Sequence, residues 1–507
     1  MRHRVVLALA TWQLVCASAG AQISPPAAAA VRPGAAARRQ SVAIEKPRSE
    51  AALDSLKAGI LAAINEPGVQ RGTWGIVVHS LDRNERLFEL NAHTLLVPAS
   101  VAKLASVASA VEAVGWDYRF ETTVRTNGNV ENGTLRGDLF IVGSGDPSTG
   151  GRGGEDVDGW IDALKSAGIR RIEGRIIGDD NALEEPRPSL AWAWDDLGYP
   201  SGALFGALNY AENKTLVRIE AGNTAGQPTA LTLDAASQGR PLVNRTVTGP
   251  KGSPLLVWPE QRPGEPALTI AGSVPAGGGP ARLMVSAGNP TLWFATVFTN
   301  RLRLAGIEVA GDAADIDDIQ VPAPTTTLFA FRSRPLSEIV PPLLKESINL
   351  YGEALMRLNA APGSLPTNDA ALAGFRTRTA TWGIAPDAEQ LIDGSGLSRR
   401  DVITPDALIV ILRRMYDRSD ASPWMQALPL AGVDGSLENR MKGTAAERNV
   451  RAKTGTMSNI RSLAGYVTTG DGEHLAFAIM LNGFEGTGPA AVQAIDAVAV
   501  RLATFRR

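Results

Sequence analysis

The order of segment types along the chain limits the folds that it can adopt. Residues 49–115 and 326–507 carry helical periodicity and hairpin patterns, whereas residues 116–325 are rich in Thr, Val, Gly and Pro and form short strand-like runs. We therefore predict an α/β (α+β) fold in which one domain, built from both ends of the chain, is interrupted by an inserted β-rich block. The helix expected near the N-terminus then packs against the sheet formed near the C-terminus.

The first 21 residues have the pattern of a cleavable export signal. A basic start, an apolar stretch and small residues near Ala19 and Ala21 follow one another. The apolar stretch is too short to span a membrane, and no later run approaches the roughly 18 apolar residues that spanning needs. We predict a signal peptide at residues 1–21, an Ala/Pro-rich tether at 22–48 and an exported protein with no integral membrane anchor.

Composition excludes several classes of function. The formal net charge is -2, and the basic residues are scattered rather than clustered as in a nucleic-acid-binding surface. Cys16, within the export signal, is the only cysteine, so the exported chain has no disulfide and no thiolate nucleophile. The four histidines lack the spacing of metal ligands. We expect neither nucleic-acid binding nor a metal or cofactor.

A serine and a lysine stand three residues apart in LLVPASVAKLASVASAVEAVG, at the start of a helix predicted from Ala99 to Val114. Residues at this spacing share a helix face, so Ser100 and Lys103 can form a hydrogen bond. Among apolar neighbours the lysine pKa falls, and a neutral amine can accept the serine proton. The alternative is that Ser100 only caps the helix and Lys103 is solvated. The chain has nine lysines against 41 arginines, which favours a chemical role for this one.

Two further short motifs are candidates for the same site. In LLKESINLYGEAL, Ser347 and Asn349 could relay a proton and hold a substrate carbonyl, although a serine N-cap is the alternative. In VRAKTGTMSNI, Lys453 supplies positive charge, Thr454 could bind a carboxylate, and Gly455 would let a substrate backbone lie close to a strand edge. An ordinary turn is the alternative there.

The three motifs together are far more specific than any one of them. S-x-x-K, S-x-N and K-T-G in this order form the set shared by penicillin-binding proteins and β-lactamases. The chain resembles the class C low-molecular-mass (type-4) penicillin-binding proteins, which are D-alanyl-D-alanine carboxypeptidases and endopeptidases. The resemblance implies a serine β-lactamase/transpeptidase-like domain, an antiparallel sheet flanked by helices. It also implies that two inserted β-rich domains occupy 116–325, between the catalytic segments 49–115 and 326–507.

The same resemblance implies a role for each motif residue. The catalytic residues are Ser100 as the acylated nucleophile, Lys103 as its base, Ser347 as a proton-shuttling hydroxyl, Asn349 as a substrate-orienting amide, and Lys453 as support for the relay and ligand of a carboxylate. Substrate binding falls to Thr454, Gly455 and Thr456, and the backbone amides of Ser100 and Thr456 would form the oxyanion hole.

Another segment, LAWAWDDLGYP, is similar to a Trp-x-Trp-x-Asp segment of this family. Its aspartate, Asp196 here, would line the pocket for the diamino-acid side chain of the stem peptide; a solvated loop acid is the alternative. On a strand, Asp195 and Asp196 would point opposite ways, which argues against a paired-carboxylate site. Where some relatives carry glutamine after K-T-G, this chain has Ser458. The glycine-rich segment Gly143–Gly154 lacks a phosphate-binding lysine, and we predict a mobile turn there.

These observations favour an exported, periplasmic serine peptidase that needs no cofactor. Its expected partners are peptidoglycan stem peptides as substrates and β-lactam antibiotics as covalent inhibitors. One alternative is a β-lactamase or esterase of the same fold, and the 244 residues between Lys103 and Ser347 argue against a β-lactamase. The other alternative is a catalytically idle wall-binding scaffold that kept the motifs.

Overall fold

A computed structural model describes residues 48–233, 240–262, 264–320 and 325–507. The predicted signal peptide, 1–21, lies outside these residues. So does the predicted tether apart from its last residue, Arg48, with which the first helix begins.

The central sheet joins the two ends of the chain. Its strands are antiparallel and lie in the order β2-β1-β22-β21-β20. The bounds are β1 Thr73–Ser80, β2 Glu85–Leu90, β20 Arg451–Met457, β21 Ile460–Thr468 and β22 His474–Asn482. Seven of the eight residues of β1 are buried, as expected for a strand covered on both faces. The pairing of β1 with β22 shows that strands near both ends of the chain form one sheet.

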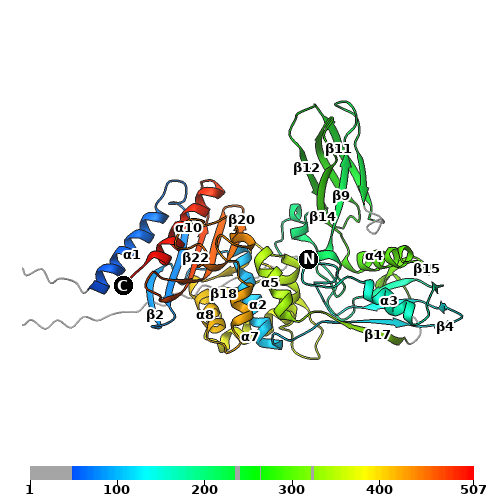
Figure 1. Ribbon diagram of the computed structural model, residues 1–507, viewed down its shortest axis with the longest axis horizontal. Helices are drawn as coiled ribbons and strands as arrows, with labels where there is room; N and C mark the ends of the chain where they lie inside the picture. Colours follow the sequence, from blue (N-terminus) through cyan, green and yellow to red (C-terminus); the bar gives the residue numbers. More distant parts are fainter. Residues whose placement is uncertain (1–47, 234–239, 263, 321–324) are drawn as a thin grey trace, which may run out of the picture. The chain divides into compact units, whose positions relative to one another are not determined.

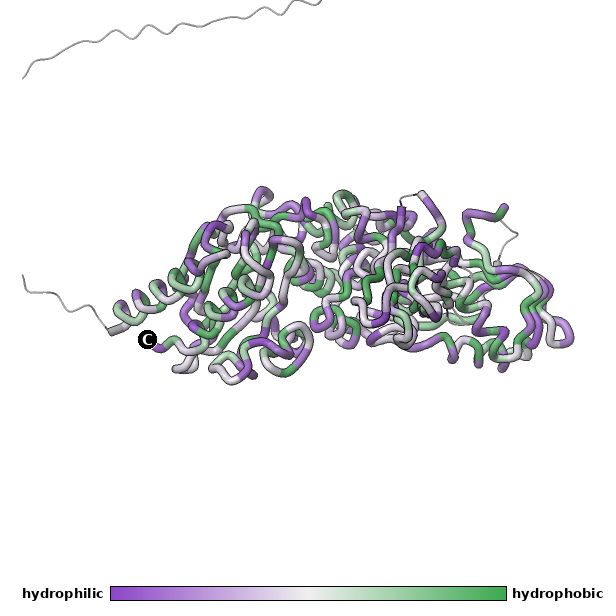
Figure 2. The backbone as a smooth tube through the Cα atoms, turned by 90° about the horizontal axis from the view of Figure 1, so that it is seen from above, coloured by the Kyte–Doolittle hydropathy of each residue, from purple (hydrophilic) through white to green (hydrophobic). Residues whose placement is uncertain are grey.

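Helices cover both faces of this sheet (Figure 1). On one face, α1 (Arg48–Ile64) and α10 (Gly488–Thr504) lie side by side over a common apolar core. Hydrophobic and hydrophilic residues alternate along α1 in Figure 2, as expected of a helix with one packed face. On the other face lie α2 (Ala102–Val114) and α8 (Pro405–Tyr416).

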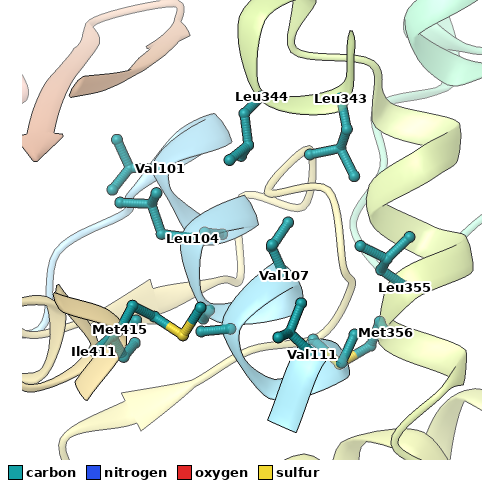
Figure 3. Close-up of a cluster of buried hydrophobic side chains, with 14 of the residues drawn as sticks. Val101, Leu104, Val107, Val111, Leu343, Leu344, Leu355, Met356, Ile411 and Met415 are labelled. Carbon is teal, nitrogen blue, oxygen red and sulfur yellow. The ribbon is translucent and has the colours of Figure 1, made fainter. Parts of the chain in front are cut away.

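Helix α2 is enclosed by other helices. Its residues 102–111 are all buried, which is the pattern of a helix at the centre of a domain. Its neighbours are α5 (Leu336–Glu346), α6 (Asn349–Arg357), α7 (Asn368–Thr381) and α8. In Figure 3, Leu104 and Val107 lie among leucines of α5 and α6 and Met415 of α8. This packing fixes the position of the helix that begins beside Ser100.

The segment between the two catalytic motifs forms separate sheets and cores. One core lies between α3 (Asp158–Ser166), α4 (Pro290–Leu304) and sheets of order β16-β8-β6-β3-β17 and β15-β7-β5-β4. A smaller core lies between sheets of order β10-β9-β14 and β11-β13-β12. The bounds are β3 Glu121–Thr126, β4 Asn129–Glu131, β5 Thr134–Arg136, β6 Leu139–Val142, β7 Arg171–Ile172, β8 Ile176–Asp179, β9 Lys214–Glu220, β10 Ala230–Leu233, β11 Leu242–Gly249, β12 Leu256–Glu260, β13 Leu268–Pro275, β14 Ala281–Ser286, β15 Glu308–Val309, β16 Ala313–Asp315 and β17 Thr326–Arg332.

Strand β17 bears on the predicted domain boundary. It begins at Thr326, where we expected the catalytic domain to resume, and it pairs with β3 of the inserted block. The first catalytic-side helix after it, α5, starts at Leu336. The division of the chain into domains stays a prediction, and this pairing favours a boundary after Arg332.

The glycine-rich segment is packed, so the prediction of a mobile turn is wrong. Asp146 and Ser148 are buried, and the Asp146 carboxylate accepts hydrogen bonds from the Ser148 amide at 2.9 Å and the Thr149 hydroxyl at 3.1 Å. The Tyr351 hydroxyl on α6 donates to the carbonyl of Arg152. The glycines allow the tight turns, and tertiary contacts then hold the segment against α6.

Candidate active site

Ser100 lies in a single 3-10 turn, Ala99–Val101, that leads directly into α2. The preceding residue, Ala99, has φ +48, a left-handed conformation that is strained for alanine. The segment before it is held by Asn482 on β22, whose amide accepts from Val97 N at 2.8 Å and donates to Val97 O at 3.1 Å. No side chain caps α2. The interpretation of Ser100 as a mere helix cap therefore has no support.

Lys103 is fully buried, with 0% of its surface exposed, which contradicts a solvated lysine. Its Nζ lies 2.9 Å from Ser100 Oγ, 2.7 Å from Asn349 Oδ1 and 2.6 Å from the carbonyl oxygen of Ser395. A neutral amine has two N–H bonds for the amide and carbonyl oxygens. Its lone pair then remains for the Ser100 hydroxyl proton.

Burial lowers the pKa of Lys103 from 10.5 to about 8, because a charged ammonium loses its hydration there. The negative charges of Asp393, Glu353 and Asp401 act in the opposite direction and keep the pKa from falling further. Near pH 8 the amine is therefore divided between its neutral and protonated forms. This is the range in which a general base is effective.

The carboxylates of Glu353, Asp393 and Asp401 act on Lys103 electrostatically and were not predicted from the sequence. Glu353 Oε1 accepts from the amides of Gly394 at 3.2 Å and Ser395 at 3.0 Å, and it holds the loop whose carbonyl contacts Lys103. Burial raises the pKa of Glu353 to about 7, and it raises that of Asp401 well above its ordinary value. The stretch DGSGLSRRDVITP resembles part of the family sequence, which is the signal that could have found Asp393 and Asp401.

Ser347 and Asn349 flank the junction between α5 and α6. Ser347 follows α5 with φ +61, a left-handed conformation, and the N-cap residue of α6 is Ile348, which makes no side-chain cap. The alternative of a serine N-cap is therefore wrong. Ser347 Oγ accepts a hydrogen bond from Lys453 Nζ at 2.9 Å. Asn349 bridges two parts of the chain, since its Oδ1 contacts Lys103 and its Nδ2 donates to Ser201 O at 2.8 Å.

The K-T-G motif lies on β20, an edge strand of the central sheet. Lys453 is fully buried, and burial followed by the positive charge of Lys103 lowers its pKa well below the ordinary value. Its Nζ also donates to Thr454 O at 2.9 Å, and the Thr454 hydroxyl donates to Ser436 Oγ at 2.7 Å. Thr456 is exposed. The structure thus brings S-x-x-K, S-x-N and K-T-G together.

Gly455 has a different neighbour from the one we expected. A Cβ built there would lie 2.4 Å from Pro98 O and 2.4 Å from Ser462 Oγ. The Ser462 hydroxyl itself donates to Pro98 O at 2.6 Å. The glycine therefore admits the backbone that precedes Ser100, and its missing side chain does not point toward a substrate.

Asp196 lies in a 3-10 turn, Trp194–Asp196, so the expectation of a strand at Asp195 and Asp196 is wrong. The side chain is half-buried, and its pKa is raised by burial and by the charge of Asp195, while Arg399 opposes the shift. The next turn, Pro200–Gly202, contributes the Ser201 carbonyl that Asn349 contacts. The segment carrying Asp196 therefore reaches the motif residues.

Among residues 48–507, without the three internal gaps, no group of three or more His, Cys, Asp or Glu side chains is arranged to hold a metal ion. Within the same residues, no helix is both long and apolar enough to cross a membrane.

Known proteins resemble this chain over most of its length. It is 34% identical over 477 residues to a D-alanyl-D-alanine carboxypeptidase of Actinomadura sp. (strain R39), covering 90% of this chain and 86% of that protein. It is 26% identical over 418 residues to D-alanyl-D-alanine carboxypeptidase DacB of Haemophilus influenzae, covering 81% and 85%. These likenesses agree with the resemblance inferred from the motifs.

Solved structures give the same result for the fold. The crystal structure of penicillin binding protein 4 (dacB) from Haemophilus influenzae matches with a TM-score of 0.78 at 23% identity, covering 88% of this chain and 99% of that one. This match confirms the predicted fold class. The D-Ala-D-Ala carboxypeptidase 3 (S13) family matches residues 56–505. The chain therefore belongs to this family of serine peptidases.

Proposed function

We propose that this chain hydrolyses the terminal D-Ala-D-Ala bond of peptidoglycan stem peptides through an acyl-enzyme at Ser100. One observation carries the proposal. Lys103 Nζ, fully buried and with a pKa lowered to about 8, lies 2.9 Å from Ser100 Oγ. A buried amine at this distance has the position and the proton affinity of a base for the serine.

Acylation follows from the contacts of the motif residues. Neutral Lys103 takes the Ser100 proton as Oγ attacks the carbonyl carbon and forms a tetrahedral intermediate. The backbone amides of Ser100 and Thr456 would hold the oxyanion, and each donor of this kind is typically worth a few kcal/mol. The C–N bond then breaks, and the proton that Lys103 took from Ser100 passes by way of the Ser347 hydroxyl to the leaving amine, which leaves Lys103 neutral again. Lys453 Nζ donates to Ser347 Oγ and holds it in place for this transfer. Water hydrolyses the ester and restores Ser100.

Lys453 and Asp196 would bind the substrate. Burial and Lys103 lower the pKa of Lys453, and the terminal carboxylate of the peptide would raise it again on binding beside β20, so that Lys453 pairs with the carboxylate as an ammonium. Asp196, on the segment that contacts Asn349 through Ser201, would bind the amino group of the diamino-acid side chain. β-Lactams present a carbonyl to the same serine and would acylate it as slowly hydrolysed inhibitors. We also propose that the chain is exported and acts in the periplasm.

Labelling with a fluorescent penicillin tests this function. We expect stable labelling of the purified protein that is lost in Ser100→Ala. Rapid turnover of the drug would instead favour a β-lactamase, and complete absence of labelling would favour an idle scaffold. Mass spectrometry after digestion of cross-linked muropeptides then separates loss of terminal D-Ala from cleavage of cross-links, and so distinguishes carboxypeptidase from endopeptidase action.

A further inference from the structure

Trp192 connects the segment that carries Asp196 to the loop behind Lys103. Its indole Nε1 donates to Asp393 Oδ2 at 2.7 Å across 201 residues of sequence. A second hydrogen bond of 2.8 Å, from the Ser398 hydroxyl to Leu190 O, joins the same two segments. The side chain of Trp192 is therefore oriented by a contact outside its own part of the chain.

Asp393 is a fully buried carboxylate that accepts several hydrogen bonds. Its Oδ1 accepts from Ser395 N at 3.0 Å, Gly396 N at 2.6 Å and Ser395 Oγ at 3.2 Å. Its Oδ2 accepts from Ser398 N at 2.8 Å and from Trp192. The donors to Oδ1 and the Ser398 amide all come from the loop that follows Asp393. The indole N–H comes from a distant segment, and its loss would leave the buried charge less compensated.

The Asp393 loop reaches Lys103 in two ways. Ser395, which Asp393 holds by its amide and hydroxyl, presents its carbonyl to Lys103 Nζ at 2.6 Å. Asp393 is also the charge that most strongly favours protonated Lys103, ahead of Glu353 and Asp401. The other titratable groups near the amine are Lys453, and Arg357 beyond Glu353.

We infer that Trp192 is a positioning residue for the base: its indole N–H compensates Asp393, so that Asp393 orients the Ser395 carbonyl on Lys103 without keeping the amine protonated. The inference rests on the proposed role of Lys103. Through this contact, the segment that carries the proposed substrate-side-chain ligand Asp196 is coupled to the base. Displacement of Trp192 would weaken acylation even though the indole contacts neither Ser100 nor the reacting carbonyl.

Trp192→Phe tests the inference, because it removes the N–H and keeps an aromatic ring. Asp393 then favours protonated Lys103 more strongly, and we expect the acid limb of the pH profile for acylation by a fluorescent penicillin to move up by about half to one pH unit. At pH values well below the acid limb, the acylation rate constant of the variant is then about three- to tenfold lower than that of the wild type. Thermal unfolding of the variant checks that it is folded.

Two controls separate this effect from general disturbance of the segment. Trp194→Phe makes the same change at a tryptophan that is 60% exposed. Ser398→Ala removes the second connection and leaves every donor to Asp393 in place. We expect both to keep the acid limb of the wild type. A Trp192→Phe limb that coincides with the wild-type limb, or lies at lower pH, overturns the inference. An unlabelled wild-type protein would instead refute the proposed function, so the two failures are distinguishable.

Discussion

Replacing Gly455 by alanine should damage acylation more than it damages the fold. The new methyl carbon would lie 2.4 Å from Pro98 O and from Ser462 Oγ, whereas Cβ contacts under 3.0 Å are essentially never seen. Strand β20 and the turn before Ser100 must therefore separate by about 0.6 Å. A misplacement of about 1 Å can cost about 100-fold in rate, so we expect a 10- to 100-fold fall in acylation. Overpacking should lower the free energy of unfolding by about 1–3 kcal/mol.

The assay is the second-order rate constant for acylation by a fluorescent penicillin, measured beside urea unfolding. Gly159→Ala is the matched control, because among the described residues nothing beyond the chain neighbours and the nearby backbone of α3 lies within 4 Å of the methyl position there. We expect this control to keep the wild-type rate. A folded Gly455→Ala protein that is acylated within about threefold of the wild-type rate would refute the reasoning that the glycine sets the spacing between β20 and Ser100.

Three other predictions concern charged residues. The acylation rate of the wild type should rise about tenfold per pH unit below pH 8 and become constant above it, because Lys103 must lose its proton. Lys103→Arg should lower the rate at least about 100-fold, since a guanidinium group stays charged. A flat pH profile or an active variant would contradict the role of Lys103 as the base. The pKa of Glu353 is raised from 4.5 to about 7. The stability that the neutral carboxyl group gives the folded protein is therefore fully present below pH 4.5 and is lost as the pH rises through 7. In urea titrations, the free energy of unfolding of Glu353→Gln should therefore be about 1–3 kcal/mol higher than that of the wild type at pH 8 and equal to it near pH 4. Equal free energies at both pH values would contradict the raised pKa of Glu353. Asp196→Ala should raise KM for a stem peptide about tenfold and change fluorescent-penicillin labelling less than about twofold; equal losses on both would contradict a side-chain pocket.

Local patterns predicted much of the site. The i, i+3 spacing of Ser100 and Lys103 and the apolar residues around them were enough to predict their hydrogen bond and the lowered pKa, because both depend on one buried helix. The strand at Lys453 was predicted from the hairpin that follows it. The joining of β1 to β22 followed from the helical and hairpin patterns at both chain ends.

Other features depend on contacts that leave no local pattern. The burial of Asp393 and Glu353 comes from packing between distant helices and loops, and an acid in a glycine- and serine-rich stretch looks like any surface acid. Gly455 reads as a place for substrate, and only the tertiary structure shows that the Pro98 carbonyl occupies the space. The same limit applies to the Gly143–Gly154 segment, whose glycines suggest mobility, whereas its contact with Tyr351 is a tertiary one.

The contact between Asn482 and Val97 has a consequence for the timing of activity. The amide that clamps the backbone before Ser100 is encoded 385 residues after it, at the end of β22. Contacts of such sequence separation form late, after the intervening chain has been made and ordered. A chain still being synthesised therefore lacks the finished turn around Ser100. On the proposed function, acylation of Ser100 can begin only when β22 has taken its place.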